Sequence, residues 1–268
     1  MKQMQLPIKF NNKFSIKKAH AMQRQLSKLV VREDTLPKRI TSVAGVDVAY
    51  TKQYSIGAVA ILDYHTLTMV EDKTAKVKTR FPYIPTLLSF REIPPALAAI
   101  RKLKTKPDVF LVDGQGIAHP YRLGFASHLG LMLGKPTIGV AKSLLCGKVS
   151  TLNQDDWAPI VDKGEVIGVA VAEDEKKPLY ISVGHKISLE RAISIVKACT
   201  TSYRVPQPIR MAHIIANKQA KNRKLGKKSK PTEESEKKGW GSTLMRSRRL
   251  GTIAKRFPRQ SRARNPHN

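Results

Sequence analysis

The chain has 268 residues, with 49 Lys and Arg against 20 Asp and Glu, so its formal net charge is +29. A charge this one-sided argues against an ordinary enzyme for a small neutral substrate and is typical of a protein that binds a polyanion, most often nucleic acid. A hydrophobic content of 41% and only two cysteines exclude wholesale disorder, a disulfide scaffold and a four-cysteine zinc site.

The sequence contains no apolar run long enough to cross a membrane, and its first residues lack the apolar core of a signal peptide. We therefore expect a soluble protein of a reducing compartment, in the cytoplasm or, in a eukaryote, the nucleus.

The positive charge is unevenly distributed. Residues 1–40 carry a net charge of +8, residues 41–216 only +7, and residues 217–268 a net charge of +14. We expect a folded domain over 1–216, with a basic helical arm over 1–40, and a disordered basic tail over 217–268. The tail could be a solubilising appendage or a nonspecific phosphate-binding arm. We favour the arm, because its basic residues come in runs.

The first predicted element is a helix over residues 17–32. Its apolar face would carry Met22, Leu26, Leu29 and Val30, with basic residues on the other face. Three strands are predicted next, at residues 42–50, 55–63 and 67–78. Because the connections between them are short, these strands should be antiparallel neighbours.

An extended loop is predicted over residues 80–90, before a helix that opens near Glu92. Pro94 and Pro95 would then lie in the first turn of that helix, where proline is tolerated. The remaining elements alternate between helices and buried strands. They are a strand at 108–113, a helix at 123–133 ended by Gly134, strands at 136–141, 165–172 and 178–183, and a last helix capped by Ser188. This order predicts the α/β class, with a mixed sheet and helices on its faces.

Three acidic residues stand where apolar residues are expected. Asp47 lies inside an apolar strand, where a carboxylate needs a partner, and small neighbours leave room beside it for an ion or a phosphate. Asp113 ends a buried strand, at the sheet edge where α/β proteins place their chemistry, and Glu92 follows the extended loop. Each could instead be structural: an ion-pair member, a turn residue or a helix-dipole partner. Together they favour a Mg²⁺ site and metal-assisted phosphodiester hydrolysis.

Three further residues are candidates for the same edge. His119 and His185 each lie at a strand-to-helix connection, and Lys142 follows a buried strand at a position suited to a phosphate. His128, inside an apolar helix, is interpreted as a core histidine. Residues 130–135 resemble a phosphate-binding loop, but the glycine spacing is one residue short and proline follows the lysine, which argues against nucleotide hydrolysis.

Five segments resemble the endonuclease V family, in the same order and at the usual intervals. They are AGVDVAY, FPYIPTLLSFRE, LVDGQGIAHPYRLGFASHLG, PTIGVAKSLLCG and YISVGHKISLERA. The similarity spans roughly residues 20–214 and excludes the tail. It implies a ribonuclease H-like fold and hydrolysis of the second phosphodiester bond 3′ to a deoxyinosine, leaving a 3′-hydroxyl and a 5′-phosphate.

The resemblance also implies Mg²⁺ as cofactor, with Mn²⁺ as a substitute, a monomer, and inosine-containing DNA as partner in DNA repair. Two alternatives remain open. Some relatives prefer inosine in RNA, and a catalytically idle nucleic-acid-binding protein would fit the charge, although such a protein should have lost one of the three acidic residues and this chain has lost none.

Residue roles follow from the matched motifs. Asp47 and Asp113 would bind the metal, Glu92 would be the third acidic member, His185 would lie beside the metal and the attacking water, and Lys142 would hold the phosphate. Other matched positions would surround a base turned out of the stack, with Tyr83 as the wedge that fills its place. These positions are Pro82, Tyr83, Ile84, Gly114, His119 and Gly124.

The sequence departs from the family pattern at three positions. Thr86 stands where glycine usually follows the wedge motif, and a side chain there should affect the base pocket or its backbone angles. Gln115 replaces a common histidine and Val183 a frequent proline, and both are expected to be tolerated.

Overall fold

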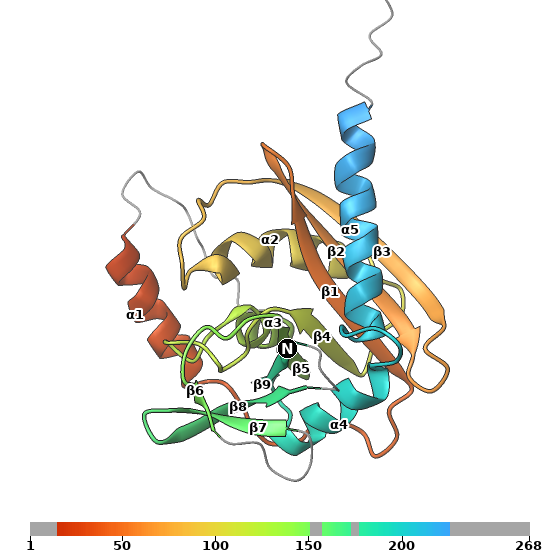
Figure 1. Ribbon diagram of the computed structural model, residues 1–268. Helices are drawn as coiled ribbons and strands as arrows, with labels where there is room; N and C mark the ends of the chain where they lie inside the picture. The colour runs from red at the N-terminus through yellow and green to blue at the C-terminus, as the bar shows by residue number, and fades with distance from the viewer. Residues whose placement is uncertain (1–14, 151–156, 173–176, 226–268) are drawn as a thin grey trace, which may run out of the picture. The chain divides into compact units, whose positions relative to one another are not determined.

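The computed structural model describes residues 15–150, 157–172 and 177–225, with side chains as far as 221 (Figure 1). Within these residues nine strands form a single mixed sheet, in the order β3-β2-β1-β4-β5-β9-β8-β7-β6. The strands are β1 (Ser42–Tyr50), β2 (Tyr54–Asp63), β3 (Met69–Lys78), β4 (Val109–Asp113), β5 (Thr137–Ala141), β6 (Lys148–Val149), β7 (Trp157–Asp162), β8 (Glu165–Val171) and β9 (Leu179–His185). The helices are α1 (Ile16–Ser27), α2 (Leu88–Ile100), α3 (Phe125–Leu133), α4 (Leu189–Cys199) and α5 (Gln207–Leu225).

The predicted antiparallel arrangement of the first three strands is confirmed, and β4 pairs in parallel with β1 and with β5. The register pairs Val46 of β1 with Val112 of β4. The next residue of each strand is Asp47 and Asp113. Asp47 therefore lies in β1 just beyond its pairing with β4, beside Asp113 at the carboxyl end of β4, the edge at which α/β sheets bind ligands.

Helices cover both faces of the sheet (Figure 1). Even-numbered β1 residues, such as Val46, pack with residues of α2 and α3, whereas Val43 and Ala49 face the side of α4 and α5. Gly45 faces α5 so closely that an added Cβ would lie 1.9 Å from the carbonyl oxygen of Pro208. Only glycine fits there, because any larger side chain would push α5 off the sheet.

Two predicted helices differ from the structure. α1 ends at Ser27, and its buried residues are Ala19 and Gln23, while Met22 and Leu29, expected on its apolar face, are exposed. α2 begins at Leu88, so Pro94 and Pro95 lie in its interior. The missing N–H groups of these prolines remove two hydrogen bonds of the helix without ending it.

Other predictions for helix ends are confirmed. Gly134 ends α3 in the left-handed conformation, with φ of 64°, and the Ser188 hydroxyl accepts the N–H of Arg191 as the N-cap of α4. Strands β6 and β7 were not predicted. No helix in the described part of the chain is long and apolar enough to span a membrane.

The largest difference concerns the predicted tail. α5 runs from Gln207 to Leu225, so the predicted boundary after residue 216 falls inside a helix, and residues 217–225 are helical. The chain divides into two units, Met1–Lys228 and Ser229–Asn268. Residues 226–268, where most of the predicted tail falls, lie outside the described residues.

Candidate functional site

The centre of the site is a group of three side chains that could hold a metal ion, Asp47, Asp113 and His213. One ligand atom from each lies within 4.8 Å of the other two. His213, on α5, donates from Nδ1 to Oδ2 of Asp47 over 2.8 Å, and the Val48 N–H donates to Oδ1 over 2.8 Å. The small residues beside Asp47, predicted to leave room for an ion or a phosphate, receive α5 at Gly45, and α5 then brings His213 to the carboxylates.

Glu92 approaches the same edge from the opposite face of the sheet, on α2. The Tyr50 hydroxyl donates to its Oε1 over 3.0 Å, while its Oε2 is buried with no hydrogen-bond partner. Burial, together with the negative charges of Asp47 and Asp113, raises the pKa of Glu92 to about 8. Burial, with the charge of Asp47, also raises the pKa of Asp113. Nearby positive charges and hydrogen-bond donors are therefore too few to stabilise these two carboxyl groups fully in their ionised forms.

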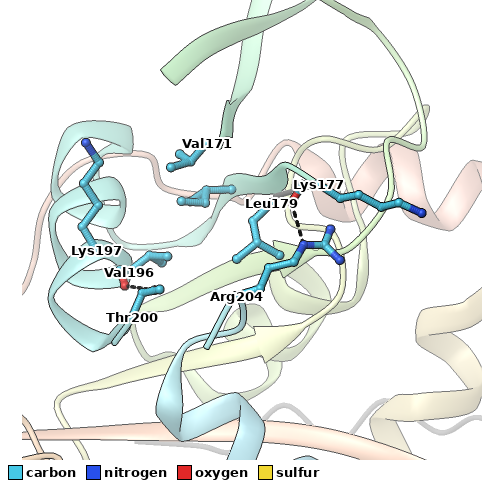
Figure 2. Close-up of a pocket in the computed structure, with 8 residues that line it drawn as sticks. Val171, Lys177, Leu179, Val196, Lys197, Thr200 and Arg204 are labelled. Atoms are coloured by element: carbon cyan, nitrogen blue, oxygen red, sulfur yellow. Dashed lines mark hydrogen bonds between the residues drawn. The ribbon is translucent and has the colours of Figure 1, made fainter. Parts of the chain in front are cut away.

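Lys142 provides one compensating charge, because its ammonium group is ion-paired with Asp113. Its main chain is fixed by Arg204. That guanidinium donates to the carbonyl oxygens of Lys142, Lys177 and Pro178, at 3.2, 2.7 and 2.7 Å. Figure 2 shows Arg204 reaching Lys177 beside a cavity of about 20 Å³. A volume that small holds about one water molecule, so this cavity is not a ligand site.

The side chains at this edge fit a divalent metal ion. Carboxylate oxygens suit Mg²⁺ and Mn²⁺, and one imidazole nitrogen is acceptable to Mn²⁺. The buried, unpartnered Oε2 of Glu92 and the raised pKa values of Glu92 and Asp113 are what a site built for a cation should show before the cation binds. The predicted carboxylates are thus brought together, and a cation held by them would stabilise all three in their ionised forms.

A cavity of about 130 Å³ adjoins these carboxylates, with Glu92 in its wall. Tyr83, with 68% of its surface exposed, stands at this cavity beside Thr86. The predicted pocket residues Gly114, His119 and Gly124 all line it. Two others flank the cavity without lining it, since Pro82 is exposed and Ile84 packs against Phe81 and Leu87.

His119 is held neutral. The N–H of Tyr121 donates to its Nδ1 over 3.2 Å, so Nε2 carries the proton and donates to the carbonyl oxygen of Thr86 over 3.0 Å. Burial lowers the pKa of His119 to about 4. His119 therefore acts at this cavity as a fixed hydrogen-bond donor and not as a cation.

The structure does not place His185 beside the acidic residues. β9 is antiparallel to β5, and His185 pairs with Thr137 at the start of β5, whereas Lys142 follows the end of β5 at Ala141. Four residue steps separate Thr137 from Ala141, roughly 13 Å at ~3.3 Å per residue. The Nδ1 of His185 accepts the N–H of Val31, a structural contact. His185 was predicted from its place after a strand and from the matched motif, but because β9 is antiparallel to β5 that place lies at the other edge of the sheet.

His213 was missed in the sequence and replaces His185 at the site. A pattern that could have revealed it is the spacing of Ile209, Ala212, Ala216 and Ala220, which are all buried on one face of α5. The interpretation of His128 as a core histidine is confirmed: it is buried, its Nδ1 lies 3.2 Å from the Ser89 hydroxyl, and burial lowers its pKa to about 4.

The two histidines give opposite predictions for metal affinity. His213→Ala should weaken Mn²⁺ binding more than tenfold, since loss of a residue that only orients a ligand already costs about 10–100-fold. His185→Ala should leave the affinity within about twofold, although it removes the acceptor for Val31. Calorimetric titration of both variants with Mn²⁺ measures this. Equal weakening would place His185, and not His213 alone, in the site.

The chain is similar to known proteins over most of its length. The sequence profile of the family described as Endonuclease V matches residues 24–214, which include His213. Endonuclease V of Thermofilum pendens is 44% identical over 210 residues, 78% of this chain and 90% of that protein. The crystal structure of Endonuclease V from Streptomyces avermitilis has a TM-score of 0.74 and 36% identity, covering 79% of this chain and 96% of that one.

A further similar structure carries a ligand. Endonuclease V of Ciona intestinalis was crystallised in complex with a 24mer DNA containing an inosine followed by a ribo-adenosine. It has a TM-score of 0.71 and 34% identity, and covers 77% of this chain and 98% of that one. The family profile matches residues 24–214, and the alignment with the Thermofilum relative covers 90% of that protein at 44% identity. The chain therefore belongs to the endonuclease V family of nucleases.

Proposed function

We propose that the protein is a metal-dependent endonuclease that hydrolyses the second phosphodiester bond 3′ to a deoxyinosine, leaving a 3′-hydroxyl and a 5′-phosphate. One observation carries this proposal: Glu92 belongs both to the acidic edge and to the wall of the cavity that Tyr83 borders. A base bound in that cavity would hold its strand beside the carboxylates. The DNA-bound Ciona relative supports the choice of substrate.

Asp47, Asp113 and His213 would hold Mg²⁺ or Mn²⁺. Such an ion would neutralise charge on the scissile phosphate and lower the pKa of a bound water. The protein groups orient the reaction. Lys142 would move its ammonium group from Asp113 to a phosphate oxygen, and the free Oε2 of Glu92 would accept a hydrogen bond from the attacking water.

Tyr83 is suited to act as a wedge because its ring is exposed on a short loop next to the cavity. Turning a base out of the stack leaves a space that an aromatic ring can fill, and a mispaired hypoxanthine costs less to extrude than a normal base. The walls formed by Gly114 and Gly124 bring main-chain groups to the edge of the base, while His119 keeps one wall in place.

The test is a duplex with a single deoxyinosine, incubated with the protein and Mg²⁺. A nick one nucleotide beyond the lesion is the expected result. Binding without a nick would overturn the proposal in favour of an idle binding protein. Matched DNA and RNA strands, each with one inosine, tell deoxyribonuclease from ribonuclease activity. Faster cleavage of the RNA would replace the DNA-repair role with the ribonuclease alternative.

The basic tail is expected to contribute affinity without chemistry. Because α5 continues to Leu225, the deletion should remove residues 229–268, which hold 11 basic and 3 acidic residues, and not the predicted segment from 217. The truncated protein should cleave at the same maximal rate, bind nucleic acid more weakly and show a flatter salt dependence. Binding measured from about 50 to 200 mM salt checks this. An unchanged slope would favour the solubility role.

A further inference from the structure

Thr86 sits in the wall of the cavity in a conformation that its side chain disfavours. Its φ is 69°, in the left-handed region, where a β-branched residue is a rare outlier. Residues held this way persist only where surrounding contacts force them, and they gather at functional sites. The contacts that hold Thr86 are therefore informative about how the cavity works.

Three side chains from outside the loop hold Thr86. Its carbonyl oxygen accepts from Gln23 Nε2 over 2.7 Å and from His119 Nε2 over 3.0 Å, and its hydroxyl lies 3.0 Å from Nε2 of His20. His20 and Gln23 belong to α1, more than sixty residues away in the sequence. Gln23 is fully buried, and its amide also reaches the Leu123 carbonyl at 3.3 Å.

The hydrogen bonds around His20 run in one direction. The Thr86 hydroxyl donates to the Pro85 carbonyl, so it must accept the proton of His20 Nε2. The Nδ1 of His20 is then an acceptor, and the Tyr121 hydroxyl donates to it over 3.1 Å. The His20 and Tyr121 rings also stack, with centroids 4.2 Å apart. The chain of donors thus runs from Tyr121 through His20 to Thr86 and Pro85.

This arrangement explains why α1 buries Ala19 and Gln23 and leaves Met22 exposed. α1 is docked mainly by polar contacts to the loop, together with Ala19 against Phe81 and Leu87. The loop that α1 contacts carries both Tyr83 and Thr86. Through Thr86, α1 is connected to the cavity wall, and its hydrogen bonds hold Thr86 in the disfavoured conformation.

We propose that α1 positions the loop of residues 83–86 through the hydrogen bond between His20 and Thr86, and that this contact sets the affinity of the cavity for a base. We call this hydrogen bond the lock. The inference rests on the proposed function for its substrate. His20 and Thr86 are positioning residues, because the groups assigned to hydrolysis, Asp47, Asp113 and Glu92, lie outside the hydrogen-bond chain.

Two substitutions of Thr86 distinguish the effect of its hydroxyl group from the effect of its side-chain volume. Thr86→Val keeps the shape and removes the hydroxyl, whereas Thr86→Ser keeps the hydroxyl. Thr86→Val and His20→Ala should each raise KM for inosine DNA about tenfold with kcat within about twofold, and the double variant should be no worse than either single one. Thr86→Ser should behave as wild type. His65→Ala, in the exposed turn between β2 and β3, is the control for loss of a histidine.

Hydrogen exchange in the free protein tests the lock without any substrate. Amides of residues 83–90 should exchange faster in Thr86→Val and His20→Ala, and as in wild type in Thr86→Ser and His65→Ala. If wild type fails to cleave inosine DNA, the proposed function fails while the exchange result still decides on the lock. Normal exchange and a normal KM in Thr86→Val would overturn the proposal. It would also be overturned if Thr86→Ser raised KM and amide exchange as much as Thr86→Val.

Discussion

Asp47→Ala is expected to abolish cleavage while nucleic acid binding stays almost unchanged. Asp47 contributes an oxygen to the metal group and holds the Nδ1 of His213, so its loss removes one ligand and releases another. Because loss of a residue that merely orients a ligand costs about 10–100-fold, loss of Asp47 should cost well over a hundredfold in rate. Binding should persist, since removing a carboxylate does not reduce the attraction of a chain of charge +29 for phosphate.

The measurement is single-turnover cleavage of inosine DNA together with a binding titration at fixed salt. Asp47→Asn is the matched control for folding, because the amide can still accept the Val48 N–H at Oδ1. It should be as inactive as Asp47→Ala and bind as well. Cleavage at the wild-type rate by either variant would remove Asp47 from the mechanism. Loss of binding together with loss of cleavage would instead indicate that Asp47 is structural.

The strands of this fold could be predicted because their pattern is local. β1 has the predicted bounds, and β4 and β5 show the unbroken apolar runs of buried parallel strands. Asp47 and Asp113 stood out for the same reason, as acids in apolar segments. Glu92 was identified from its position after an extended loop and from the matched motif, although its helix begins earlier than predicted, at Leu88.

The remaining parts of the site depend on contacts distant in the sequence. α5 buries alanines and one isoleucine and carries three lysines and two arginines, so its second half resembles a solvated tail, and packing against Gly45 makes the helix part of the core. His185 looked like a site residue until the antiparallel direction of β9 placed it at the other edge. The contact between His20 and Thr86 joins segments that no local pattern connects.

Glu92→Gln should stabilise the metal-free protein against unfolding above pH 7. The pKa of Glu92 is raised to about 8 in the fold, from an ordinary value of 4.5. The folded state therefore holds a proton that the unfolded chain has lost. The stability from this group is complete below about pH 4.5 and is lost as the pH rises through about 8. The full shift corresponds to ~5 kcal/mol as an upper limit, so a difference of roughly 2–4 kcal/mol is expected.

Urea unfolding in EDTA at pH 5 and at pH 8.5 measures this difference. Wild type should lose more stability between the two conditions than Glu92→Gln, whose amide is neutral throughout and can still accept the Tyr50 hydroxyl. The Asp113 pKa, also raised, leaves a smaller pH dependence in both proteins. Mn²⁺ should restore the stability of wild type at pH 8.5 and do so less in the variant, because a bound cation favours the ionised carboxylate. If both proteins lost the same unfolding free energy between pH 5 and pH 8.5 without metal, Glu92 would be ionised in the folded protein. The acidic edge would then not need a cation to stabilise this carboxylate.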